Sequence, residues 1–219
     1  MYKYIILDFG NVLVYSPTND WDITPKFKEL IDINKIDIDK FRKLVDKNRY
    51  LLDEKILTLD EEYNMFIKFY DNILSNLDYP NYNIEISKQL AYYRTYSMDK
   101  YNVYDNVIDE LTKLKDKYKL IMLTDNWPCV EPYLKEHKLY DFFDKIYISS
   151  IYGYLKRDKV LFDYPIKDYN IKKGEALFID DLESNLDPAY EKGIDVLLMD
   201  RNNNVNKSKY KVINNLYNI

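Results

Sequence analysis

Cysteine, histidine and glycine are scarce in this chain, and each shortage excludes a class of functional site. Of 219 residues, one is cysteine, one is histidine and four are glycine. A single cysteine and a single histidine cannot build a disulfide framework, a zinc site with four Cys or His ligands, or a two-histidine metal pair. The scattered glycines form neither a Gly-x-Gly-x-x-Gly motif nor a P-loop. Any metal site must therefore rely on oxygen ligands, chiefly carboxylates.

Charge and hydropathy narrow the class of protein further. Acidic residues number 37 against 32 basic ones, so the formal net charge is -5 and gives no reason to expect nucleic-acid binding. No apolar run is long enough to span a bilayer or to form a signal-peptide core. The lone Cys129 is consistent with a reducing compartment. We therefore expect a cytoplasmic protein, monomeric or homodimeric, with no nucleic-acid or membrane partner.

Five short apolar runs predict the strands of a sheet. They are nearly continuous rather than alternating, which is typical of strands buried on both faces beneath helices. Helical patterns cover residues 105–117 and 184–192, and the second of these ends at Gly193. This alternation predicts an α/β fold with a parallel sheet. The apolar runs are residues 4–9, 119–125, 145–149, 176–180 and 195–199.

Residues 16–99 have a different pattern, with helical stripes of apolar side chains and no convincing strand. Thr58 and Glu61 are spaced as in a capping box, which marks the start of a helix. We expect these stripes to pack helix against helix. The sequence therefore predicts an α/β core domain, residues 1–15 and 100–219, interrupted after its first strand by a helical cap domain, residues 16–99.

Polar side chains end three of the predicted strands. Asp8 ends the first, Thr124-Asp125-Asn126 ends the second, and Asp180-Asp181 ends the fourth. Ligands of open parallel sheets bind beyond the carboxyl ends of the strands, so we expect these side chains to converge. One such residue could simply cap the following helix. Three converging strand ends instead indicate a functional site.

Four short motifs, in this order, resemble those of the haloacid dehalogenase-like hydrolase superfamily. The run from Asp8 to Leu13 (DFGNVL) resembles the first motif, Thr124 the second, Lys156 the third, and the run from Asp180 to Asn185 (DDLESN) the fourth. The spacing of 116 residues from Asp8 to Thr124 leaves room for a cap. The resemblance covers almost the whole chain and implies a Rossmann-like, three-layer α/β core. Within the superfamily, the motifs most resemble those of the small-capped branch, which contains glucose-1-phosphate phosphatases and the phosphatase domains of epoxide hydrolases.

The resemblance implies a catalytic role for three residues. Asp8 matches the nucleophile, which would form an aspartyl-phosphate intermediate. Thr124 matches the residue that holds the transferring phosphoryl group, and Lys156 the cation that offsets the charge of Asp8 and the phosphate. Other residues next to these motifs are expected to bind substrate: Gly10, Asn11, Asp125 and Asn126.

The resemblance also implies a cofactor, Mg2+, which prefers hard oxygen ligands. Its expected ligands are the carboxylates of Asp8 and Asp181 and the carbonyl oxygen of Gly10. Asp180 and Asn185 are expected behind them, where they would orient the metal or the lysine. The paired acids of this motif favour metal-dependent phosphoryl transfer over dehalogenation.

Three positions depart from the superfamily pattern. Gly10 stands where most phosphatases carry a second Asp that acts as general acid and base, a group that contributes roughly 10² to 10⁴ in rate. Its loss should weaken the enzyme and favour good leaving groups, such as those of sugar 1-phosphates or aryl phosphates. Asp125 replaces the usual Asn; we expect a cap or hydrogen-bond acceptor rather than a replacement acid. Arg157 replaces the usual Pro, and we expect it at a solvated helix start.

The function predicted from the sequence is that of a Mg2+-dependent phosphatase acting on a small phosphorylated metabolite, with a sugar phosphate expected. Two alternatives stay open. A catalytically weak relative would use the fold to bind a phosphorylated metabolite or a protein, as Gly10 would allow. A haloacid dehalogenase-type hydrolase would work without metal.

Overall fold

A six-stranded sheet forms the centre of the protein, whose computed structural model describes residues 1–80, 82–217 and 219. All pairings in this sheet are parallel, and the strand order is β5-β4-β1-β6-β7-β8. The five predicted strands are confirmed, and a sixth, shorter strand extends one edge. The strands are β1 (Tyr4–Leu7), β4 (Lys119–Thr124), β5 (Lys145–Ile148), β6 (Ala176–Asp180), β7 (Asp195–Met199) and β8 (Val212–Ile213).

Helices cover both faces of the sheet, which confirms the predicted three-layer, Rossmann-like α/β architecture. Successive residues of a strand face opposite layers. Ile5 of β1 therefore packs with α5 (Val107–Lys115) and α6 (Val130–Glu136), whereas Ile6 packs with α8 (Val160–Tyr169) and α9 (Glu183–Glu191). Shorter helical turns connect these layers: α7 (Ser149–Tyr152), η3 (Tyr140–Phe142) and η4 (Lys156–Asp158).

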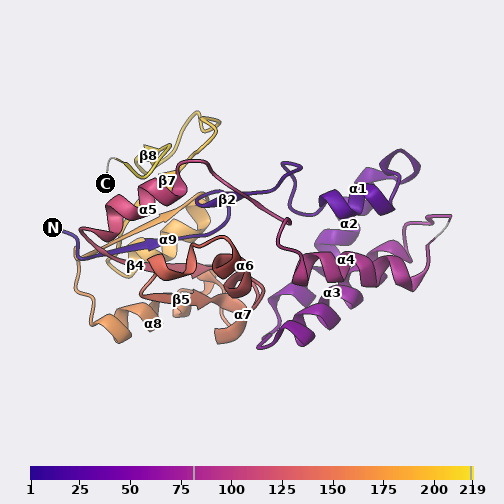
Figure 1. Ribbon diagram of the computed structural model, residues 1–219, viewed down its shortest axis with the longest axis horizontal. Coiled ribbons are helices and arrows are strands. Elements are labelled where there is room, and N and C mark those ends of the chain that lie inside the picture. Colours follow the sequence, from indigo (N-terminus) through magenta and orange to yellow (C-terminus); the bar gives the residue numbers. More distant parts are fainter. Residues whose placement is uncertain (81, 218) are drawn as a thin grey trace.

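The segment between the first two long strands is helical and builds a hydrophobic cluster of its own. In Figure 1 its helices stand to one side of the sheet. The capping box is confirmed, because Thr58 accepts a hydrogen bond from the backbone of Glu61 and the Glu61 side chain accepts one in return. We call residues 16–99 the helical insert; the exact domain boundaries stay a prediction. Its elements are α1 (Pro25–Leu30), η1 (Ile33–Lys35), α2 (Ile38–Asn48), η2 (Arg49–Asp53), α3 (Leu59–Leu74) and α4 (Ile84–Tyr96).

Two short strands flank the helical insert and pair with each other. β2 (Val14–Tyr15) runs antiparallel to β3 (Asn102–Val103), so the chain leaves the sheet and returns to it side by side (Figure 1). Two residues are too few to show a strand period, which is why the sequence did not reveal this pair.

The order of the strands brings the polar strand ends together. β1 lies between β4 and β6, and Leu7 pairs with Met122 on one side and Ile179 on the other. Asp8 therefore projects beyond the sheet between Thr124 and Asp180. Among the described residues, no helix is both long and apolar enough to cross a membrane.

Candidate active site

Three carboxylates and one ammonium group meet at the carboxyl ends of β1 and β6. One oxygen each from Asp8, Asp180 and Asp181 lies within 4.8 Å of the others. Lys156, at the start of η4, places Nζ 2.8 Å from Oδ1 of Asp8 and 2.6 Å from Oδ2 of Asp180. Asp8, Asp180 and Lys156 are all buried, so these charges interact with little screening by water. The fourth-motif acids and the third-motif lysine thus lie beside the first-motif Asp.

Burial and mutual repulsion shift the pKa values of this cluster. Burial raises the pKa of Asp8 to about 7, although the charge of Lys156 opposes the shift. Burial and the neighbouring charge of Asp180 raise the pKa of Asp181 to about 6. For Lys156, burial alone would lower the pKa, but the charges of Asp180 and Asp8 raise it well above its ordinary value. Lys156 is therefore charged, but its single positive charge does not balance the three neighbouring carboxylates.

Asp180 is held by hydrogen bonds on both oxygens. Oδ1 accepts from the backbone N–H of Leu182 at 2.8 Å, and Oδ2 accepts from Nζ of Lys156 at 2.6 Å. The Nδ2 amide of Asn185, in the first turn of α9, donates to both oxygens at 3.1 and 3.2 Å. With its acceptors occupied in this way, Asp180 serves to fix Lys156 in front of Asp8.

The end of β4 contributes a hydroxyl and two polar side chains. Thr124 is buried, lines the same cavity as Asp8, and makes no side-chain hydrogen bond within the described part of the chain. Asp125 Oδ1 accepts from the backbone N–H of Lys156 at 2.9 Å, and burial raises the pKa of Asp125. Asn126 Oδ1 accepts from the backbone N–H of Trp127 at 3.0 Å. Thr124 is thus the residue here whose hydroxyl is available to a ligand.

The loop after β1 contributes Gly10 and Asn11. Gly10 lines the cavity beneath the indole of Trp21. Asn11 adopts a left-handed backbone conformation, with φ 53°, which asparagine tolerates better than most residues. Its backbone N–H donates to the carbonyl of Val14 at 2.7 Å, and Nδ2 donates to Oδ2 of Asp181 at 2.8 Å. Asn11 therefore orients Asp181 in addition to lining the cavity.

The donor set of this cluster fits a divalent cation. Oδ1 of Asp8 is buried and receives no hydrogen bond, because Nζ of Lys156 approaches it at 2.8 Å without hydrogen-bond alignment. When all three clustered carboxylates are ionised, they carry three negative charges against the single positive charge of Lys156. Carboxylate oxygens without a donor and with surplus negative charge are the ligands that Mg2+ prefers.

The cavity in front of Asp8 has a volume of about 440 Å3 and is bordered on one side by residues of the helical insert. Trp127, which follows Asn126, lines it; the indole packs edge-on against Phe66 at 5.1 Å and donates to the carbonyl of Leu52 at 3.2 Å. We call this space, in front of Asp8, the reaction cavity. Three arginines also line it: Arg49, Arg94 and Arg157.

Arg94 was not singled out by the sequence. It lies on α4, its Nη1 donates to the carbonyl of Trp21 at 2.8 Å, and its guanidinium lies 5.0 Å from the centre of the Phe66 ring. The buried residues of α4 include Leu90 and Ala91, so Arg94 follows them at helical spacing on the same inward face. A charged residue on an otherwise buried helical stripe is the signal that could have identified it.

Further polar contacts join the helical insert to the sheet domain around this cavity. Arg157 forms an ion pair with Asp53 at 2.6 Å, so this exposed arginine contacts the insert as well as solvent. Ile56 N–H donates to the carbonyl of Ser150 at 3.0 Å. Farther in, the buried Glu62 of α3 accepts from the backbone N–H of Cys129 at 2.8 Å.

Known proteins are similar to this chain in sequence or in structure. D-ribitol-5-phosphate phosphatase from Bacteroides thetaiotaomicron is 25% identical over 222 residues, which cover 89% of this chain and 90% of the relative. The magnesium-bound HAD-hydrolase YfnB from Bacillus subtilis has a similar structure, with a TM-score of 0.71 at 16% identity, covering 99% of this chain and 96% of that one. A HAD-family enzyme from B. thetaiotaomicron, in complex with magnesium and inorganic phosphate, gives 0.66 at 20% identity over 94% and 98%.

The two structural likenesses establish the fold, and a sequence-family model establishes the relationship. The model of the haloacid dehalogenase-like hydrolases matches residues 2–189, a range that contains all four motifs. The chain therefore belongs to the haloacid dehalogenase-like hydrolase family.

Proposed function

We propose that this hydrolase is a Mg2+-dependent phosphatase that cleaves a small phosphorylated metabolite, with a sugar or polyol phosphate as the expected class. One observation carries the proposal: the buried carboxylate of Asp8, the half-buried carboxylate of Asp181, the ammonium of Lys156 and the free hydroxyl of Thr124 border one cavity. Phosphoryl transfer needs a nucleophile, a metal-binding acid, a fixed cation and a donor to the phosphate oxygens.

The residues proposed to hold Mg2+ are Asp8, Asp181 and Gly10, the last through its carbonyl oxygen. Asp8 and Asp181 belong to the acidic cluster, and Oδ1 of Asp8, which is ion-paired with Lys156 but accepts no hydrogen bond, would serve as a ligand. Bound there, the ion would neutralise charge on the phosphate and withdraw electron density from phosphorus. Asn11 would keep Asp181 in position through their 2.8 Å hydrogen bond.

In the first step, a carboxylate oxygen of Asp8 would attack phosphorus. The new O–P bond gives an aspartyl-phosphate, while the bond from phosphorus to the leaving oxygen breaks. Lys156 would offset the growing negative charge, and the Thr124 hydroxyl would donate to a phosphate oxygen. Water would then attack phosphorus, release inorganic phosphate and restore the carboxylate of Asp8. Because Gly10 offers no acid, the leaving oxygen would take its proton from solvent.

The helical insert would act as a cap that closes the reaction cavity and selects the substrate. Its contribution to the cavity wall includes Arg49, Leu52 and Arg94. Of the two arginines, Arg49 is paired with Asp22 and Asp46, whereas Arg94 has no carboxylate partner among the described residues. The guanidinium of Arg94 would therefore be free to donate to oxygens of the bound phosphate ester.

The relatives support this choice of reaction. D-ribitol-5-phosphate phosphatase is named for a phosphorylated polyol, and one similar structure contains both magnesium and inorganic phosphate. The buried, free thiol of Cys129 suits the reducing cytoplasm in which we propose that the enzyme works.

The experiment that tests this function is a panel of phosphorylated metabolites assayed with Mg2+, together with Asp8→Asn. The panel includes D-ribitol 5-phosphate, glucose 1-phosphate, glucose 6-phosphate and p-nitrophenyl phosphate. We expect release of phosphate from at least one compound and a loss of more than about 10³-fold with Asp8→Asn, since removal of a nucleophile abolishes the covalent route. Activity that survives this substitution would refute the role of Asp8.

The same panel decides between the proposal and its alternatives. No turnover of any compound, combined with binding of one of them, would identify a catalytically weak binding protein. Release of halide from a 2-haloacid in the presence of chelator would identify a metal-independent dehalogenase. A faster rate on glucose 6-phosphate than on glucose 1-phosphate would contradict the preference for a good leaving group.

A further inference from the structure

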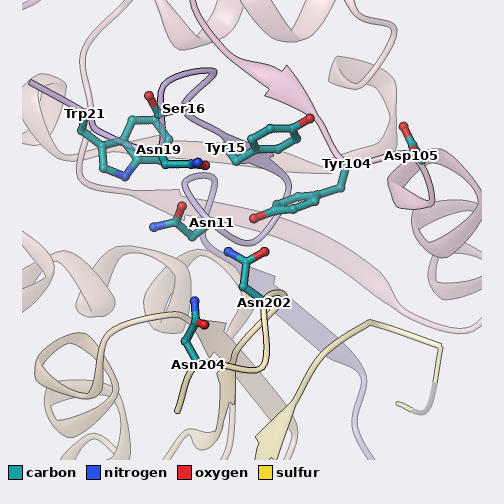
Figure 2. A pocket seen from close by; sticks show the side chains of 9 residues that line it. All are labelled: Asn11, Tyr15, Ser16, Asn19, Trp21, Tyr104, Asp105, Asn202 and Asn204. Carbon is teal, nitrogen blue, oxygen red and sulfur yellow. The ribbon is translucent and has the colours of Figure 1, made fainter. Parts of the chain in front are cut away.

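A second cavity, of about 650 Å3, adjoins the reaction cavity (Figure 2). It lies where the two linkers of the helical insert pass the loop that follows β7. Asn11 and Trp21 line both cavities, so the two spaces are neighbours. We call this space the amide cavity, after its four asparagines. Its lining residues are Asn11, Tyr15, Ser16, Asn19, Trp21, Tyr104, Asp105, Asn202 and Asn204.

Polar groups in the amide cavity lack protein partners. The side-chain amides of Asn19, Asn202 and Asn204 make no hydrogen bond within residues 1–80, 82–217 and 219. The hydroxyl of Tyr104 is enclosed and also has no partner. Figure 2 shows this hydroxyl pointing toward Asn11, with the amide of Asn202 directed toward both. An enclosed polar group without a hydrogen bond costs roughly 1–3 kcal/mol, so the Tyr104 hydroxyl is placed to gain one from a ligand. The amides of Asn19, Asn202 and Asn204 are exposed, so they are open to a ligand that enters from solvent.

The charge of the amide cavity excludes an anionic occupant. Of its nine lining residues, none is lysine or arginine, and one, Asp105, is acidic. Arg201 lies over the Tyr104 ring at 5.1 Å, but its charge is paired with the buried Glu110 at 2.6 Å. A second phosphate or carboxylate would therefore find no free cation here. The reaction cavity differs, because three arginines and Lys156 line it.

Amides and aromatic rings together suit one ligand chemistry. Asparagine side chains both donate and accept, as hydroxyl groups do, so each can bind adjacent hydroxyls of one molecule. The rings of Tyr15 and Tyr104 lie 4.8 Å apart and, with the indole of Trp21, offer apolar surface for C–H groups. A neutral, polyhydroxylated chain or ring presents both kinds of surface.

We propose that the amide cavity binds the uncharged, polyhydroxylated part of the substrate, while the phosphate of the same molecule lies in the reaction cavity. This inference rests on the proposed phosphatase function and adds the residues that bind the hydroxyl-bearing part of the substrate. Asn11 joins the two ends, because its amide is 2.8 Å from Oδ2 of Asp181 and borders the amide cavity. The substrate is thus a monophosphate of a sugar or polyol with several free hydroxyls, and not a bisphosphate or a phosphorylated acid.

The sharpest test is Tyr104→Phe, which removes one unpartnered hydroxyl and keeps the ring. The measured quantity is the KM for D-ribitol 5-phosphate divided by the KM for p-nitrophenyl phosphate, which has no hydroxyl. We expect this ratio to rise by roughly two- to tenfold, the cost of one lost hydrogen bond. Because the hydroxyl has no protein partner, a purely structural residue would leave the ratio unchanged and the melting temperature equal or higher.

Asn202→Ala provides a second, independent variant, with Asn34→Ala as its control. Asn34 is an exposed asparagine of η1 outside both cavities, so its removal tests for general effects of losing a surface amide. We expect the KM ratio to rise with Asn202→Ala and to stay constant with Asn34→Ala. Unchanged ratios for both Tyr104→Phe and Asn202→Ala, in an enzyme that hydrolyses the two phosphates, would overturn the proposal.

Free D-ribitol separates a substrate subsite from an independent site. If the amide cavity holds the substrate's hydroxyls, ribitol inhibits hydrolysis of D-ribitol 5-phosphate competitively, and Tyr104→Phe weakens this inhibition. Ribitol that binds without inhibiting would overturn the claim that one molecule spans both cavities. If neither phosphate is hydrolysed by the unmodified enzyme, the proposed phosphatase function fails, whatever the amide cavity binds.

Discussion

The indole of Trp21 lies against Gly10, where a Cβ added to the glycine would be 3.5 Å from Cζ2 of the ring. This is an ordinary van der Waals distance, and the φ angle of Gly10 is outside the left-handed region that favours glycine. Neither the backbone nor the space therefore demands glycine at this position. Its lack of a side chain instead removes the acid that the family resemblance leads one to expect there.

Gly10→Asp is expected to speed the hydrolysis of alkyl phosphates, because the new carboxyl can protonate the leaving oxygen. We expect a gain of about ten- to a hundredfold in kcat for D-ribitol 5-phosphate, at the lower end of what a positioned acid supplies. The gain should be smaller for p-nitrophenyl phosphate, whose leaving group needs no proton. Gly10→Ala adds the Cβ without the acid; an equal gain with alanine would rule out proton transfer as the cause.

Asp125 is expected to serve as a hydrogen-bond acceptor and not as an acid. Its Oδ1 accepts a hydrogen bond from the backbone N–H of Lys156 at 2.9 Å. Asp125→Asn keeps an acceptor oxygen, so turnover should stay within about threefold of the unmodified enzyme. Asp125→Ala removes the acceptor and leaves that N–H unpaired, a loss worth roughly 1–3 kcal/mol, so stability should fall. Steady-state kinetics and thermal unfolding of both variants provide the measurement. A large loss of kcat with Asp125→Asn would instead show that the carboxyl takes part in proton transfer.

Removal of the metal should abolish phosphatase activity. We expect a chelator to stop phosphate release and added Mg2+ to restore it. Asp181→Asn should raise the Mg2+ concentration for half-maximal activity by at least about tenfold, because an amide replaces a charged ligand. A titration of activity against Mg2+ measures this shift. The same half-maximal concentration in both proteins would exclude Asp181 as a ligand.

Glu62 should make the stability of the protein depend on pH. Its side chain is fully buried, and one of its oxygens has no hydrogen-bond partner. Burial raises the pKa of Glu62 to about 7, although hydrogen bonding to Cys129 and the charges of Lys100 and Arg94 oppose the shift. The folded state therefore binds this proton more tightly than the unfolded chain does, and stability falls as pH rises from about 4.5 to 7.

The size of this effect is about 3 kcal/mol for a shift of this magnitude. Glu62→Gln keeps an acceptor for the N–H of Cys129 but cannot ionise, so it should lose less stability between pH 5 and pH 8 than the unmodified protein. Chemical denaturation of both proteins at the two pH values measures the free energy of unfolding. The loss in one protein is then subtracted from the loss in the other, which removes the contributions of all other titrating groups. Equal losses in the two proteins would show that Glu62 is not responsible.

The sheet could be predicted because its strands are buried on both faces and read as continuous apolar runs. The active-site residues could be predicted because Asp8, Thr124 and Asp180 follow those runs directly, and parallel strands end at one edge of a sheet. Their assigned chemical roles came from the motifs; the distances between Asp8, Lys156 and Asp181 came from the structure.

Other parts of the site depend on contacts that no local pattern encodes. Arg94 reaches the cavity only because α4 packs against α3, and Asn202 borders the amide cavity only because the loop after β7 lies beside the linkers. The strands β2, β3 and β8 are two residues each, too short for a period to appear. The positions of these residues are determined by tertiary packing, which a single sequence does not show.

The antiparallel pair of β2 and β3 has a consequence for how the enzyme can change. Val14 pairs with Val103, so the ends of the helical insert are neighbours and a short turn could bridge them. The insert also has its own hydrophobic cluster, separate from those of the sheet. We therefore expect that the insert can be exchanged or diversified as a unit, so that new substrates are recruited while the residues proposed to perform the chemistry stay in place.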